Sequence, residues 1–318
     1  MNDSKLLKKK VFEFIKSYNL FILLIIFVII AAILSPNFLQ TQNIMNIWQR
    51  SSIPGIVAIG MTFVIIIGGI DLSVGSVVAF SGVFVALLLQ ASVPIPLAIL
   101  LATASGVISG LGAGLLITRW KLPDFIVTMA IMTSVRGAAL IMTNGTPLFD
   151  LNEGFKFLGQ GKVLGLPISG LIWVSLTLVS AWVLKYTKYG RSLFAIGGNK
   201  EAAYLSGIRV NLIYTSVYVI CGLLAAFSGV ILASWLATGQ PTEGAGYELG
   251  AIAAVVLGGT ALSGGKGGVV GTFGGVVLLS IITNIFNLMG LSSYYQLIFS
   301  GAIIVGALLL NKAMDNRS

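Results

Sequence analysis

Residues 213–236 read IYTSVYVICGLLAAFSGVILASWL and contain no charged side chain. A helix of about 20 apolar residues is long enough to cross a hydrocarbon core of about 30 Å. Similar apolar runs recur along the chain from Leu20 to Leu310. We therefore predict a membrane protein that crosses the bilayer many times.

The composition agrees with this prediction and argues against enzyme activity. Of the 318 residues, 57% are hydrophobic and 9% are charged, whereas soluble domains carry about 25% charged residues. Cys221 is the single cysteine and histidine is absent. A disulfide framework, a thiolate metal site and the commonest general base are therefore missing. These absences count against an enzyme and against a metal or cofactor bound by this chain.

Basic residues give the predicted spans a direction, because lysine and arginine collect on the cytoplasmic side of a membrane. Residues 1–19 are rich in lysine and are placed inside. Ten spans follow, at about residues 20–34, 51–69, 73–89, 96–118, 123–143, 169–184, 213–236, 249–262, 269–288 and 294–310. This model puts 15 of the 19 basic residues and both termini in the cytoplasm, and three basic residues outside. The net positive charge is thus an orientation signal and not a nucleic-acid site.

The predicted fold is an all-α helical bundle that forms one transmembrane domain over residues 1–318. An open sheet would leave backbone groups unpaired in lipid. Glycines four residues apart favour close helix packing. They occur at Gly106, Gly110 and Gly114, and again at Gly267, Gly271 and Gly275.

The longest basic loop, residues 185–210, contains a short predicted helix. Asn199 suits its N-cap, Glu201 its positively polarised first turn, and Gly207 the position just after its end. Ala202 and Ala203 would leave one face smooth. A capped helix of about seven residues at a membrane surface suits docking into a groove of another protein. An ordinary amphipathic connector is the alternative.

A second segment, residues 60–76, places one acid between two apolar runs. Because a carboxylate is costly at that depth, we expect Asp71 to cap the N-terminus of the following span. A pairing with Arg136 and a place in a polar pathway remain alternatives. Gly69, Ser73 and Gly75 flank the acid in the string Gly-Ile-Asp-Leu-Ser-Val-Gly.

A third segment, residues 239–268, ends in Leu-Gly-Gly-Thr-Ala-Leu-Ser-Gly-Gly-Lys-Gly-Gly. It does not fit a phosphate-binding loop, because Thr260 replaces the first glycine of that motif and Gly267 replaces its serine or threonine. The chain is therefore not expected to hydrolyse ATP. The motif residues of this segment are Gly258, Gly259, Gly264, Gly265 and Lys266.

These three segments, in this order on a ten-span chain, resemble the permease subunits of carbohydrate-type ABC importers. The resemblance is closest to the group that carries ribose, xylose, arabinose, galactosides and autoinducer-2, and it covers nearly the whole chain. Glu201-Ala-Ala with Gly207 resembles the EAA loop of these permeases, although the usual Ile-x-Leu-Pro ending is replaced by Ile-Arg-Val-Asn.

The resemblance implies a BtuC-like (type II) permease architecture in the cell membrane. It also implies a cytoplasmic ATPase subunit that holds the ATP and magnesium, an extracytoplasmic sugar-binding protein, and a second permease copy. Asn199, Glu201, Ala202, Ala203 and Gly207 would then couple to the ATPase, and the motif residues around Asp71 and Lys266 would take part in gating. The implied cargo is a monosaccharide, with ribose or another pentose favoured.

A sugar path needs hydrogen-bonding groups and aromatic faces along its wall. The candidates are Asn46, Trp48, Gln49, Phe80, Arg136, Asn144, Asn284 and Gln296, each of which could instead serve helix packing. Arg136 is expected to find a partner or to reach outward, because it lies well inside a span. Arg50, Asp150, Glu153, Glu243 and Glu248 are candidate contacts for the binding protein. An ion-coupled secondary sugar transporter is the competing function.

Overall fold

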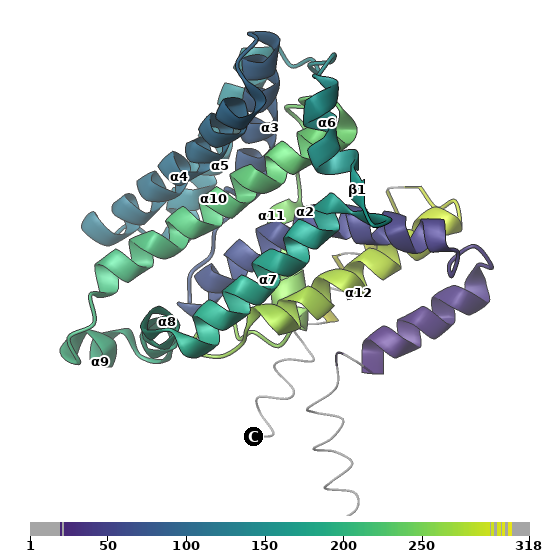
Figure 1. The fold of residues 1–318 in the computed structure, drawn as a ribbon. Helices are drawn as coiled ribbons and strands as arrows, with labels where there is room; N and C mark the ends of the chain where they lie inside the picture. Colours follow the sequence, from purple (N-terminus) through teal and green to yellow (C-terminus); the bar gives the residue numbers. More distant parts are fainter. Residues whose placement is uncertain are drawn as a thin grey trace, which may run out of the picture.

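The computed structural model describes residues 20, 22–292, 294–295, 298–299, 301–302 and 305–306, and most of these are helical (Figure 1). The first helix is Ile22–Leu34. The lysine-rich N-terminus, Gln296 and much of the tenth predicted span lie outside the described residues. The other elements are α2 (Thr41–Ile66), α3 (Val74–Gln90), α4 (Ile95–Arg119), α5 (Asp124–Thr143), α6 (Glu153–Gln160), β1 (Lys162–Val163), β2 (Leu166–Pro167), α7 (Ile168–Tyr186), α8 (Lys188–Gly198), α9 (Lys200–Leu205), α10 (Val210–Leu236), α11 (Tyr247–Leu257) and α12 (Val269–Leu288).

Six helices of the described residues are long and apolar enough to cross a membrane, namely α2, α4, α5, α7, α10 and α12. Helix Ile22–Leu34, α3 and α11 are apolar but shorter. All nine fall on predicted spans. Their bounds agree with the predicted ones within a few residues, except at the start of α2 and the end of α11.

Helix α2 begins at Thr41, well before the predicted start at residue 51. The polar residues of its first turns do not end the helix because they find partners. Gln49 Nε2 donates to the carbonyl oxygen of Gly159 over 2.6 Å, and Asn46 Oδ1 accepts from Gln42 Nε2 over 3.1 Å. Helix α11 ends early, at Leu257, because Gly259 adopts a φ of +85° and turns the chain.

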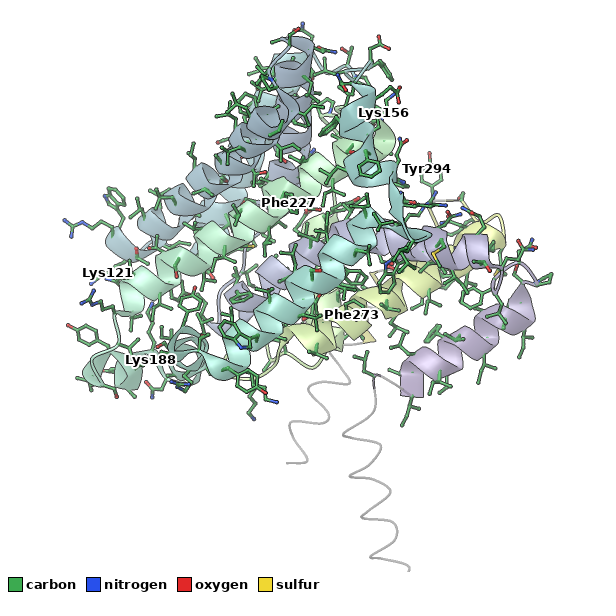
Figure 2. The ribbon with its side chains drawn as sticks, viewed as in Figure 1. Lys121, Lys156, Lys188, Phe227, Phe273 and Tyr294 are labelled. Carbon is green, nitrogen blue, oxygen red and sulfur yellow. The ribbon has the colours of Figure 1, made fainter. Side chains whose placement is uncertain are left out.

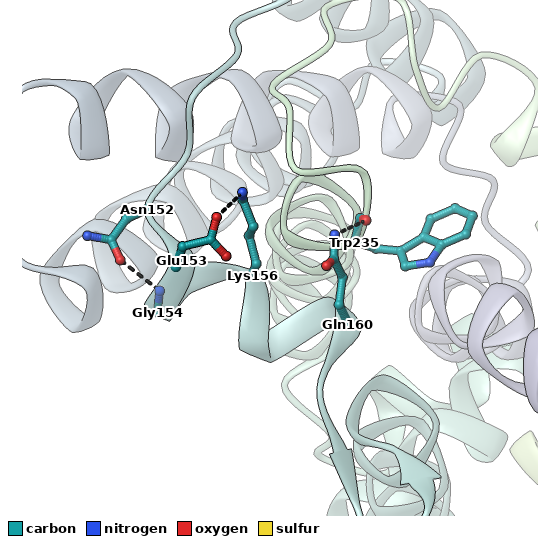
Figure 3. Close-up of polar contacts among 6 residues, drawn as sticks. All are labelled: Asn152, Glu153, Gly154, Lys156, Gln160 and Trp235. Carbon is teal, nitrogen blue, oxygen red and sulfur yellow. Dashed lines mark hydrogen bonds and ion pairs between the residues drawn. The ribbon is translucent and has the colours of Figure 1, made fainter.

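The predicted outer stretch, residues 144–167, contains the short helix α6 and a two-stranded hairpin of β1 and β2. This hairpin is a small exception to the predicted all-α fold. Asn152 caps α6 by accepting from the N–H of Gly154 over 2.8 Å, and Gln160 Nε2 donates to the carbonyl oxygen of Trp235 over 2.9 Å (Figure 3). The bond from Gln160 fixes α6 on the end of α10.

Helix α10 is the centre of the bundle and packs against α2, α3 and α4. A Cβ built on Gly106 would overlap the carbonyl oxygen of Gly222, and one on Gly110 or Gly114 would also overlap the α10 backbone. The predicted packing role of this glycine series is confirmed. In the second series, Gly271 and Gly275 bring α12 equally close to Gly258 and α11.

The two predicted sides of the membrane lie at opposite ends of the bundle. Helices α8 and α9 lie at one end, and α6 lies at the other (Figure 1). Lys121 and Lys188 are found at the α9 end, and Lys156 at the α6 end (Figure 2). The loop expected to reach an ATPase and the loops expected to face a binding protein are therefore well separated.

Candidate functional site

Helix α9 has the caps that its sequence predicts. Asn199 Oδ1 accepts a 2.9 Å hydrogen bond from the N–H of Ala202. At the other end Gly207 has a φ of +83°. The N–H of Ile208 donates over 3.1 Å to the carbonyl oxygen five residues earlier, which completes a Schellman motif. The predicted helix is confirmed, with bounds Lys200–Leu205.

The exposed face of α9 differs from the expected smooth face. Ala203 is only 4% exposed and packs onto the protein, so it is not available for docking. Glu201 and Ala202 are exposed. Tyr204 and Leu205, which the sequence analysis did not single out, are 70% and 78% exposed. On a helix the residues that follow a buried position point to other faces. With Ala203 facing the protein, the helical period places Tyr204 and Leu205 away from it.

Helix α8 connects α9 to the bundle. The Tyr189 hydroxyl lies 2.8 Å from Ser216 Oγ of α10. Burial raises the pKa of Tyr189, and the hydrogen bond with Ser216 opposes part of that rise. The phenol therefore stays neutral at physiological pH and keeps α8 attached to α10.

The three segments singled out in the sequence meet at the C-terminal end of α2. The N–H of Gly265 donates to the carbonyl oxygen of Ile66 over 2.9 Å. A Cβ built on Gly197 of α8 would overlap this same oxygen, and one on Gly264 would lie 3.0 Å from it. We call Ile66, Gly197, Gly264 and Gly265 the motif junction. It joins α8 directly to α2 and to the loop that follows α11.

The glycines of the loop after α11 serve its backbone path. Gly259, Gly264 and Gly265 have φ values of +85°, +84° and +74°, a region that favours glycine. The carbonyl oxygen of Lys266 accepts from the N–H of Ala261 over 3.2 Å, while the lysine side chain is exposed. The loop is thus a tight turn that fits against α8 and α2.

Asp71 lies in the break between α2 and α3 and is 1% exposed. Its Oδ1 accepts from the N–H of Ser73 over 2.9 Å and from the Ser73 hydroxyl over 2.6 Å. Ser73 is the N-cap residue of α3. Asp71 therefore acts at the start of the following span through Ser73.

The two glycines that flank Asp71 allow close approach of other segments. A Cβ on Gly69 would lie 2.7 Å from the Tyr218 hydroxyl. A Cβ on Gly75 would overlap the carbonyl oxygen of Gly244 and a carboxylate oxygen of Glu248. Both positions thus require a residue without a side chain.

A cavity of about 670 Å³ opens between α2, α11 and α12. Its lining comes from the halves of α2 and α12 that the charge pattern places toward the outside and from the N-terminal part of α11. Asn43, Asn46, Arg50, Thr283, Asn284 and Asn287 contribute polar groups to its wall. Ala253, Ala254 and Val276 give it an apolar part farther along these helices.

Two of the predicted path residues, Asn46 and Asn284, line this cavity. Asn284 forms a reciprocal amide pair with Asn43, with N···O distances of 2.8 and 3.1 Å. Arg50, expected to face the binding protein, also lines the cavity, and its guanidinium carbon lies 5.6 Å from the centre of the Trp235 ring.

The other described path candidates lie elsewhere. Trp48 packs against Trp173 and Phe273, with centroid separations of 5.8 and 6.1 Å. Phe80 packs against Phe84 at 5.8 Å. Gln49 bonds to α6 as described above, and so serves to connect helices.

Asn144 and Arg136, the last two described candidates, both belong to α5 and its C-terminal end. Asn144 is the left-handed C-cap residue of α5. Arg136 donates from Nη1 to the carbonyl oxygens of Pro241 and Glu243 over 2.6 and 2.7 Å. The expectation that Arg136 finds a partner is confirmed, and the partner is not Asp71.

A family model described as the permease component of a branched-chain amino acid transport system matches residues 43–308. The chain belongs to this permease family. It is therefore a transport subunit and a multi-pass protein of the cell membrane, as its charge and apolar pattern predict. The competing ion-coupled transporter is not supported.

Relatives named as sugar permeases share most of the chain with the protein. The ribose import permease protein RbsC of Bacillus subtilis is 48% identical over 295 residues, which cover 92% of this chain and 91% of that one. RbsC of Escherichia coli K12 is 43% identical over 296 residues, covering 91% and 92%. The L-arabinose permease AraH of Azospirillum brasilense is 37% identical over 300 residues, covering 93% and 88%. No solved structure matches.

Proposed function

We propose that this permease imports ribose in an ATP-driven transporter. The observation that carries the proposal is the gradient of identity among the relatives. Ribose permeases from three genera are 41–48% identical to this chain, whereas the arabinose and D-allose permeases are 37% and 34% identical. All of these matches cover at least 91% of the chain, so the difference is not one of alignment length.

The α9 end of the bundle is the proposed docking site for a cytoplasmic ATPase. Tyr204 and Leu205 project from a rigidly capped helix, and Glu201 and Ala202 are exposed beside them. Exposed apolar side chains on a short helix suit a groove in a partner. ATP and magnesium would be bound by that partner, and this chain would supply the surface through which its closure is transmitted.

The motif junction is the proposed route of that transmission. Movement of α8 relative to α2 would separate Gly197 from Ile66, whose carbonyl oxygen also accepts from the N–H of Gly265. Because packed backbone contacts of this kind behave as rigid connections, α8 would move the ends of α2 and α12 together. Both helices line the cavity.

The cavity is the proposed outer part of the sugar path. The amide groups of Asn46 and Asn284 in its wall can exchange hydrogen bonds with the hydroxyl groups of a sugar. The apolar part of the wall offers the sugar only weak contacts. A weak site suits an importer whose binding protein supplies selectivity. We place the extracytoplasmic binding protein over this end, and a second copy of the permease against the open side of the cavity. The full arrangement would be ten spans in a type II architecture, with both termini in the cytoplasm.

The test is reconstitution of the permease in proteoliposomes with its cognate ATPase and sugar-binding protein. We expect ATP-dependent uptake of labelled ribose that excess unlabelled ribose suppresses. Arabinose, allose and leucine should compete weakly. Uptake of leucine or another sugar that ribose does not reduce would overturn the ribose proposal. Uptake that survives an inactive ATPase but collapses with a protonophore would overturn ATP coupling.

A further inference from the structure

The segment after α10, residues 239–246, was expected to remain in an outer loop, but it runs inward along α3. Gly239 begins beside the outer half of α3, where a Cβ on it would lie 3.0 Å from the carbonyl oxygen of Gly82. Gly244 ends against Gly75, because a Cβ on either would overlap the carbonyl oxygen of the other. Seven helical residues separate these contacts, or roughly 10 Å of helix rise. We call residues 239–246 the inward segment.

One end of the inward segment forms part of the cavity wall. Ala245 and Gly246 line the cavity together with Tyr247, the first residue of α11. Ala245 and Gly246 are exposed. The segment contains glycines at positions 244 and 246 with φ values of +73° and +84°. A small shift of this backbone would therefore change the width of the cavity at that wall.

Arg136 holds the middle of the segment. Its guanidinium reaches from α5 and donates to two carbonyl oxygens, those of Pro241 and Glu243, over 2.6 and 2.7 Å. The carboxylates of Glu248 and Glu243 add electrostatic attraction. A planar guanidinium is well suited to hold two acceptors at once, so one side chain fixes the middle of the segment.

The packing behind the middle of the segment contains one small void. A void of about 10 Å³ lies between residues of the segment, such as Gln240 and Glu243, and the helices α3 and α10. The nearby Thr238 hydroxyl is buried without a hydrogen-bond partner among the described residues. Gly239, at the start of the segment, is held by paired 2.9 Å backbone hydrogen bonds with Leu148, so Arg136 is the attachment of the middle of the segment.

We propose that Arg136 is a positioning residue that holds the inward segment back from the cavity and so keeps the outer mouth of the transport path open. Without its two hydrogen bonds, the segment moves toward the cavity and narrows it. The role of the cavity as a sugar path rests on the proposed function. The position of the inward segment, and its attachment to Arg136, do not depend on which cargo is carried.

The experiment uses the complete transporter with Cys221 replaced by alanine, since Cys221 is buried and is the only native thiol. Single cysteines are introduced by Ala245→Cys in the segment and by Lys162→Cys in the hairpin. Each is combined with Arg136→Met, Arg136→Lys or the control Thr133→Val. Thr133 lies on the same helix and bonds only to carbonyl oxygens of its own helix.

We expect Arg136→Met to lower labelling of the Ala245→Cys thiol by a membrane-impermeant maleimide about tenfold, since two charged hydrogen bonds are lost. Labelling of the Lys162→Cys thiol should stay unchanged. The ammonium group of Arg136→Lys can still donate to both carbonyl oxygens and should restore part of the labelling and of the ribose uptake. Thr133→Val should match the parent in both measurements.

The labelling is measured without sugar, so it tests the position of the segment even if ribose is not the cargo. Unchanged labelling of the Ala245→Cys thiol in a normally abundant Arg136→Met protein would overturn the proposal. If the methionine variant does not accumulate, the lysine variant decides, because it must then show intermediate labelling. Parent-like labelling combined with lost uptake in Arg136→Lys would also overturn it.

Discussion

Alanine substitutions at Gly197 and Gly198 should have opposite effects, although the two glycines are neighbours in α8. A Cβ at Gly197 would overlap the carbonyl oxygen of Ile66 and the backbone nitrogen of Gly265. A Cβ at Gly198 would have no atom within 4 Å. Neither glycine has a positive φ, so backbone strain does not separate them. The pair therefore isolates the contact made at the motif junction.

The magnitude follows from three effects at Gly197. Overpacking costs about 1–3 kcal/mol, and damage to the hydrogen bond from Gly265 to Ile66 adds about 0.5–1.5 kcal/mol. The better helix propensity of alanine offsets up to about 1 kcal/mol of this loss in stability. The net loss is about 2 kcal/mol, or about 30-fold in an equilibrium. Gly198→Ala should be neutral or stabilising by about 0.4–1 kcal/mol.

The assay compares both variants with the parent in three measurements: thermal unfolding of the purified permease, co-purification of the ATPase, and ATP-driven ribose uptake. Gly197→Ala should unfold at a lower temperature and lose most uptake, whereas Gly198→Ala should resemble the parent. If Gly197→Ala transports normally, or if the two variants are equally impaired, the junction does not carry the coupling that we assign to it.

Three further substitutions test the docking helix, the helix break and the cavity. Asn199→Ala removes the acceptor for the N–H of Ala202 and should destabilise α9 by about 1 kcal/mol, which is measured as reduced ATPase co-purification. Asp71→Ala leaves Ser73 without its acceptor and should lower the permease melting temperature, whereas Asp71→Asn keeps one acceptor oxygen and should lose less. Asn284→Leu removes an amide from the cavity and should reduce ribose uptake about tenfold, as expected for about 1.4 kcal/mol, without releasing the ATPase.

Each of these expectations has a result that contradicts it. If the Asn199→Ala variant recovers as much ATPase as the parent, the cap made by Asn199 is not needed for docking. Equal melting temperatures for the alanine and asparagine variants at position 71 would show that hydrogen bonding to Ser73 is not the source of stability. Ribose uptake at the parent rate in Asn284→Leu would mean that the sugar path does not use that wall of the cavity.

Local features of the fold were predictable because local chemistry controls them. The length of an apolar run determines whether a helix can cross the bilayer, and nine described helices fall on predicted spans. The caps of α9 depend on Asn199 and Gly207, which lie within a few residues of the groups they satisfy. The start of α2 was missed because the partner of Gln49 lies on α6, far along the chain.

The candidate site was predicted only in part, for the same reason. The sequence identified Arg136 as a buried charge in need of a partner, but its partners are two carbonyl oxygens that no side-chain pattern reveals. Asn46 and Gln49 were equal candidates for the sugar path. The fold turns Asn46 into the cavity and gives Gln49 to α6.

The amino-acid sequence by itself determined that this protein resides in a membrane, where its spans lie, and that residues 199–207 form a capped helix. Apolar run length, charge placement and capping act over short distances, so they can be identified without knowing the fold. Only the tertiary structure decided that Gly197, Ile66 and Gly265 meet and that residues 239–246 turn inward to line a cavity. Glycines and carbonyl groups make these contacts, and their partners are set by how distant helices pack.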